Sequence, residues 1–96
     1  MYICFAEYRI KTENKIEYLH YIEQMKTANP ALRVYEGTDQ PDLFVEVWQA
    51  ESAEEAEQIK KERLSERSSW CQMADWVPGG LAKVHVWTFK PISAPS

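Results

Sequence analysis

Long apolar runs, cysteines and positive charge are all scarce in this chain of 96 residues. No run of about 18 apolar residues occurs, so no segment is predicted to cross a membrane as a helix. The two cysteines, Cys4 and Cys71, allow at most one disulfide, which excludes a disulfide-rich secreted scaffold. The 11 Lys and Arg are outnumbered by 15 Asp and Glu, and the net charge of −4 makes nucleic acid and anionic lipid unfavourable partners.

Glycine and proline are infrequent, with three and five residues, which excludes a collagen-like or low-complexity chain. The length suits one domain, which we place over residues 1–92, with a flexible tail over 93–96. Glu7 and Arg9 interrupt the N-terminal residues where a signal peptide would need a continuous apolar stretch. We therefore expect a cytoplasmic protein with reduced thiols.

The chain does contain a regular alternation of strand-like and helix-like segments. Strands are predicted over residues 1–10, 31–36, 43–48 and 81–89, and helices over 13–28, 52–67 and, briefly, 70–77. The order of the main elements is strand, helix, strand, strand, helix, strand. This order predicts the α+β class, with a ferredoxin-like βαββαβ domain whose four-stranded antiparallel sheet has both helices on one face.

Side chains alternate between the two faces of each predicted strand, so the faces can be sorted by composition. We place an aliphatic set beneath the helices, with Cys4 and Ala6 continuing it on the first strand: Leu32, Val34, Leu43, Val45, Val47, Ala82, Val84 and Val86. The other face then carries aromatic and ionisable side chains: Phe5, Glu7, Arg9, Arg33, Tyr35, Phe44, Glu46, Trp48, Lys83, His85, Trp87 and Phe89. On the first strand, the opposite choice of Ile3 and Phe5 toward the helices stays open.

A face so rich in rings needs a cover, because exposed apolar patches larger than a few hundred Å² are uncommon on monomers. Either a second copy of the chain covers it completely, or a partly open cleft remains. In a cleft, His85 is the candidate general base, with Glu7 or Glu46 handling protons beside it. The alternative is an imidazole that only pairs with one of these carboxylates inside an interface.

The walls of such a cleft are expected to contact a small apolar ligand. Phe5, Trp48 and Trp87 are the candidates for shaping it, and Arg33 is a further polar candidate. Trp70, in the segment after the second helix, is another candidate for substrate contact, with core packing as its alternative.

Residues that bind metals are not grouped at a ligand spacing. Glu17, His20 and Glu23 lie three residues apart on the first predicted helix, but carboxylate-bridged metal sites need several helices. The cysteines and histidines have no zinc-ligand spacing. We expect no metal and no cofactor.

The element order, the length and the mixed sheet face resemble the dimeric α/β-barrel superfamily, in particular its antibiotic-biosynthesis-monooxygenase-like branch. Residues 68–73 and 81–87 carry the likeness. The resemblance implies a homodimer that packs sheet against sheet. It also implies either a cofactor-independent monooxygenase acting on a small aromatic or apolar substrate, or a non-catalytic ligand-binding or protein-interaction module. The haem role of some members does not carry over, because the first strand has no Asn and residues 70–77 contain no His.

Overall fold

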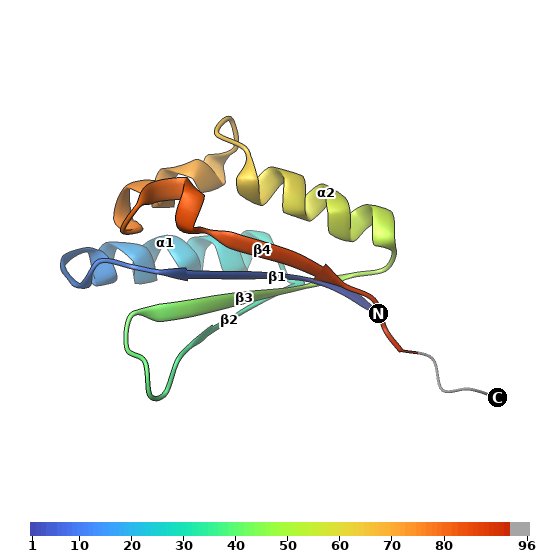
Figure 1. Ribbon diagram of the computed structural model, residues 1–96, viewed down its shortest axis with the longest axis horizontal. Coiled ribbons are helices and arrows are strands. Elements are labelled where there is room, and N and C mark those ends of the chain that lie inside the picture. The colour runs from blue at the N-terminus through green and yellow to red at the C-terminus, as the bar shows by residue number, and fades with distance from the viewer. Residues whose placement is uncertain (93–96) are drawn as a thin grey trace.

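The protein consists of a four-stranded antiparallel sheet with both α-helices over one face (Figure 1). The computed structural model describes residues 1–92, apart from the side chain of Ser69. The strands lie in the spatial order β2-β3-β1-β4: β1 (Tyr2–Arg9), β2 (Leu32–Glu36), β3 (Leu43–Ala50) and β4 (His85–Phe89). This topology confirms the predicted ferredoxin-like α+β fold. The predicted tail over 93–96 lies outside the described residues.

The first helix connects β1 to β2 in the chain and covers the sheet. α1 (Lys15–Ala28) follows a 3₁₀ turn, η1 (Thr12–Asn14), which contains the predicted helix start. The helix ends before Pro30, whose ring disfavours helical geometry at the preceding residue. Asn29 Nδ2 donates to the Met25 carbonyl oxygen at 2.8 Å and so satisfies one of the free carbonyls of the last turn.

The second helix, α2 (Ala53–Leu64), begins at the predicted cap. Ser52 Oγ accepts the Glu55 N–H at 3.1 Å, which satisfies one of the free donors of the first turn. The helix ends at Leu64 because the next residue, Ser65, is already extended. The prediction that it continues to residue 67 is therefore wrong.

Two 3₁₀ segments connect α2 to β4: η2 (Ser69–Trp76) and η3 (Gly80–Lys83). Gly79 has a positive φ of 89°, which starts the turn into η3 and favours glycine at that position. Because η3 uses the residues before Val84, β4 begins at His85 and not at residue 81 as predicted. Ala82 is exposed in η3, so its predicted place in the core is wrong.

The predicted sorting of the sheet faces is confirmed on β1, β2 and β4 and reversed on β3. Cys4 and Ala6 of β1, Leu32 of β2 and Val86 of β4 are buried beneath the helices, as predicted. On β3, however, the side chains buried on the helix side are Phe44, Glu46 and Trp48. The predicted face assignment of β3 is therefore wrong, and its aliphatic side chains lie on the other face.

Arg63 of α2 is the reason for the reversal. Its Nη2 lies 2.7 Å from Glu46 Oε2, and both side chains are fully buried, so the carboxylate enters the core with a paired charge. Arg63 follows Ala56 and Ile59 at helical spacing on the apolar side of α2. An arginine on that stripe needs a buried carboxylate opposite it, and Glu46 on β3 supplies one.

The sheet face that points away from the helices is called the open face from here on. The strand registers align its residues in rows, such as Arg33, Val47, Phe5 and Trp87 in one row. The members of the open face are Ile3, Phe5, Glu7, Arg9, Arg33, Tyr35, Leu43, Val45, Val47, Gln49, His85, Trp87 and Phe89.

Candidate ligand-binding site

A cleft of about 340 Å³ opens where β1 continues beyond its pairing with β4. We call it the end cleft. It is lined by residues of β1, of the loop before β3, of the 3₁₀ segments and of β4: Glu7, Tyr8, Arg9, Gln40, Leu43, Val77, Pro78, Lys83 and His85. Its lining therefore combines ionisable groups with an apolar wall, which is the usual composition of a small-molecule site.

Two of the predicted proton-handling residues meet in the end cleft. Glu7 of β1 and His85 of β4 are direct cross-strand partners, so their side chains leave the same face of the sheet as neighbours. Glu7 is half-buried and His85 is exposed. A carboxylate beside an imidazole can accept or donate a proton to a bound molecule, provided the molecule enters this cleft.

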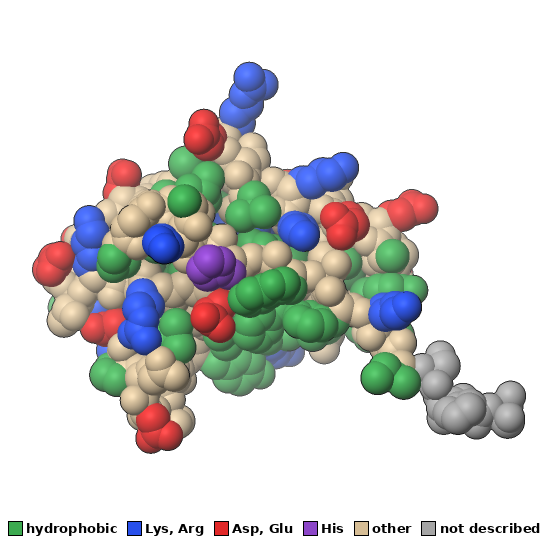
Figure 2. Space-filling view, viewed as in Figure 1, with side chains coloured by type: hydrophobic (Ala, Val, Ile, Leu, Met, Phe, Trp, Pro, Cys, Tyr) green, Lys and Arg blue, Asp and Glu red, His purple; other side chains and the backbone are tan. Residues whose placement is uncertain are grey.

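Aromatic side chains adjoin the end cleft along β4. The His85 and Trp87 rings stack with centroids 6.0 Å apart, and Phe5 lies 5.9 Å from Trp87 and 6.2 Å from Phe89. We call Phe5, Trp87 and Phe89 the aromatic patch. Figure 2 shows one side of the molecule, with hydrophobic side chains gathered along the sheet beside a histidine and an acidic side chain. The predicted placement of Phe5 and Trp87 on the open face is confirmed.

Arg33 also lies on the open face, as predicted, but it does not line the end cleft. Its Nη1 donates to the backbone carbonyls of Pro30 at 3.1 Å and Leu32 at 3.2 Å. Its register partner on β3 is Val47, whereas Glu7 pairs with Val45. Arg33 is therefore in another row of the sheet than the Glu7 and His85 pair.

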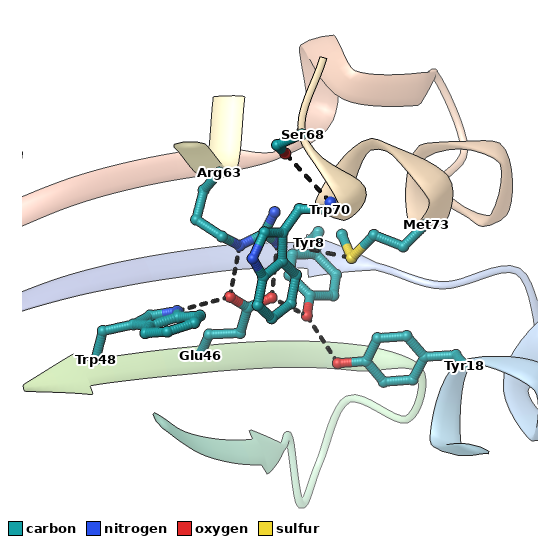
Figure 3. A network of polar contacts seen from close by, with 8 residues as sticks. All are labelled: Tyr8, Tyr18, Glu46, Trp48, Arg63, Ser68, Trp70 and Met73. Atoms are coloured by element: carbon teal, nitrogen blue, oxygen red, sulfur yellow. Dashed lines mark hydrogen bonds and ion pairs between the residues drawn. The ribbon is translucent and has the colours of Figure 1, made fainter. Parts of the chain in front are cut away.

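Glu46, Trp48 and Trp70 lie on the opposite side of the sheet, between the strands and the helices (Figure 3). Arg63 donates to both Glu46 oxygens, from Nε and Nη2 at 2.7 Å each, and Trp48 Nε1 donates to the same carboxylate at 2.9 Å. The expectation that Glu46 and Trp48 share a pocket with His85 is therefore wrong. Their side chains point into the core, away from the open face.

The hydrogen-bonded network around Glu46 extends to two tyrosines. The Tyr8 hydroxyl donates to Glu46 Oε2, so the Tyr18 hydroxyl is the donor in its 2.8 Å contact with Tyr8. Arg63 lies over the Trp70 ring at 4.2 Å, a cation–π contact that also keeps Trp70 in the core. This network orders the interior, and its only unpartnered buried side-chain atom among the described residues is Arg63 Nη1.

Burial sets the protonation of this network. Desolvation and the neighbouring Glu46 charge raise the pKa of Tyr8 well above its ordinary value. Desolvation alone would lower the pKa of Arg63, but the Glu46 charge and its hydrogen bonds raise it overall. Burial and Glu46 also raise the pKa of Cys4 to about 11. These groups therefore keep their protons near neutral pH.

The described residues contain no group of three or more His, Cys, Asp or Glu side chains that could hold a metal ion. Over the same part of the chain, no helix has the length and apolarity needed to cross a membrane.

Comparison with known proteins bears on the fold. No family model and no curated protein matches the chain. Among solved structures, a Deinococcus radiodurans protein described as a candidate antibiotic biosynthesis monooxygenase superposes with a TM-score of 0.64 at 15% identity, over 100% of this chain and 97% of its own. The chain shares the fold of that protein.

A second solved structure also shares the fold of the chain. A protein from Agrobacterium tumefaciens superposes with a TM-score of 0.63 at 18% identity, over 96% of this chain and 94% of its own. The resemblance to the antibiotic-biosynthesis-monooxygenase-like proteins is thus confirmed at the level of the fold. At these identities the chemistry must be argued from this chain's own residues.

Proposed function

We propose that this protein is a cytoplasmic homodimeric α/β barrel that binds a small aromatic or apolar molecule in the end cleft. The observation that carries the proposal is the cross-strand pair of Glu7 and His85 in a cleft of about 340 Å³. Ligand sites typically measure about 300–1,000 Å³ and combine apolar walls with a few converging polar groups. Both cysteines are free thiols, as a reducing compartment would keep them.

The occupant of the open face in this proposal is a second copy of the chain. Tyr35, Trp87 and Phe89 are 56%, 44% and 49% exposed, and the same face carries half-buried aliphatic side chains of β3. A twofold arrangement lets each copy cover the rings of the other with the same surface. The face carries both signs of charge, including Arg33 and Glu7, so opposite charges from two copies can meet.

A titration with the neutral probe 2-naphthalenemethanol tests ligand binding, followed by the amide chemical shifts of the protein. We expect shifts at the lining residues Glu7, Leu43 and His85, because the ring would pack against the wall of the end cleft. His85→Ala should weaken the binding, whereas His20→Ala, which removes an exposed histidine of α1, should not. Shift changes confined to other parts of the chain would contradict the proposal.

A cofactor-independent monooxygenase is the second candidate function. The specific observation is again the pair of Glu7 and His85, since removing a proton from a phenolic substrate makes it electron-rich enough to react with oxygen. The fold shared with a candidate antibiotic biosynthesis monooxygenase supports it. Oxygen consumption with phenols and quinols is the assay. His85→Ala should abolish turnover and spare the dimer, and unchanged turnover would refute the role of His85.

A further inference from the structure

Positive charge gathers in the end cleft, although the chain carries a net charge of −4. Arg9 and Lys83 line the cleft, and Glu7 is its only acidic lining residue. The lining therefore has an excess of one positive charge with His85 neutral, and of two when His85 is protonated. Walls of low dielectric concentrate such a field, so an anion is attracted more strongly to the cleft than to the acidic surface around it.

The two cations of the end cleft are available to a ligand. The ion pairs within residues 1–92 use Lys15, Lys26 and Arg63, and neither Arg9 nor Lys83 takes part in one. Arg9 Nη2 donates to the neutral amide oxygen of Gln40 at 2.9 Å, a contact that holds the guanidinium in place without neutralising it.

The end of β1, which carries Arg9, is anchored through the backbone to the segments on both sides of it. The Ile10 N–H donates to the Asp42 carbonyl at 2.9 Å, and the Lys11 N–H donates to the Trp76 carbonyl at 2.7 Å. These bonds join the end of β1 to the loop before β3 on one side and to η2 on the other. These three segments of the cleft thus have a fixed spacing, and a ligand would not have to order them on binding.

Gly79, the residue before η3, leaves room for the Lys83 side chain. A Cβ atom at Gly79 would lie 2.6 Å from Lys83 Cγ, so only a glycine lets the aliphatic stem of the lysine lie this close to the backbone. The apolar wall beside the cations consists of Leu43, Val77 and Pro78. This combination suits a molecule with a flat apolar body and an anionic group at one end.

We propose that the molecule bound in the end cleft is a small aromatic carboxylate. Arg9 and Lys83 bind the carboxylate, since a guanidinium matches its two oxygens and an ammonium adds a point charge. The ring packs on Leu43, Val77 and Pro78, with Glu7 and His85 at its other side. This inference rests on the proposed function of the end cleft and names its ligand class.

The test compares 2-naphthoate with its neutral analogue 2-naphthalenemethanol by calorimetric titration of the full chain. Charged hydrogen bonds contribute about 1.5–3 kcal/mol, so naphthoate should bind about tenfold to a hundredfold more tightly. Arg9→Gln and Lys83→Gln should each remove most of this preference, and added salt should reduce it. Lys61→Gln, which removes the same charge from the exposed side of α2, should leave it unchanged.

The outcomes separate the inference from the function on which it rests. If both probes bind equally, or if the preference for naphthoate survives in Arg9→Gln and Lys83→Gln, the carboxylate assignment is overturned and the ligand-binding cleft stands. If neither probe binds, the proposed function is overturned together with the inference. Both substituted side chains are exposed, and a thermal melt of each variant verifies that it is folded.

Discussion

The ion pair between Glu46 and Arg63 offers the sharpest test of how the core is built. In Arg63→Met the flexible side chain fills similar space, but the Glu46 carboxylate keeps its charge at a site with no exposed surface. Removing one partner of a buried ion pair costs about 3–5 kcal/mol. This cost is a large share of the free energy of unfolding of an ordinary domain, which is about 5–15 kcal/mol.

Urea unfolding followed by tryptophan fluorescence measures this cost. Arg67→Met is the matched control, because Arg67 is exposed and its substitution should change the free energy of unfolding by less than about 0.5 kcal/mol. The double variant Glu46→Gln with Arg63→Met removes the stranded charge and keeps an acceptor for Trp48. It should recover about 0.5–3 kcal/mol relative to Arg63→Met alone.

The opposite result would refute the reasoning. If Arg63→Met cost no more than Arg67→Met, the guanidinium would be solvated and Glu46 would not be its buried partner. Glu46 would then belong on the open face, as the alternation of aliphatic residues along β3 first indicated, and the description of both faces of β3 would be wrong.

Two further predictions follow from the pKa shifts in the core. Cys71 is half-buried, whereas Cys4 is fully buried and its pKa is raised to about 11 by desolvation and Glu46. A maleimide at pH 8 should therefore label Cys71 in the native protein and Cys4 only after unfolding, as read by peptide mass spectrometry. Fast labelling of Cys4 in the native protein would show that β1 is not covered. Burial raises the pKa of Tyr21 from 10.0 to about 12 and that of Cys4 from 9.0 to about 11, so both groups are harder to ionise in the folded state. Their contribution to stability is complete below about pH 9 and is lost as the pH rises toward 12, which a series of urea midpoints should record as a decline; a constant midpoint over that range would contradict their burial.

Period-two patterning was sufficient for three strands because their two faces differ strongly. Val84, just before β4, and Val86 within it alternate with His85 and Trp87, and only one assignment places aliphatic side chains under the helices. On β3 both faces are apolar, and the residue that decides between them is a carboxylate. Its orientation depends on Arg63, which is 17 residues away in sequence, and the arginine on the apolar stripe of α2 was the signal that could have revealed it.

The end cleft could be predicted only in part. The pairing of Glu7 with His85 follows from strand order and alternation, so both residues were candidates from the sequence. Arg9 and Lys83 were assigned to the same face but without a role, because the cleft depends on where β4 begins. That boundary is set by the 3₁₀ segment η3, which the alternating sequence of residues 81–89 conceals.

The central claim is that a second copy of the chain covers the open face. Sedimentation equilibrium of the full chain tests it most directly, with Val47→Lys at the middle of the face and Gln24→Lys on the exposed side of α1 as the matched control. We predict a dimer at micromolar concentration for the unchanged protein and for Gln24→Lys, and a monomer for Val47→Lys, because a charge in the interface would lose its water. A monomer in all three samples, or a dimer that Val47→Lys leaves intact, would contradict the account.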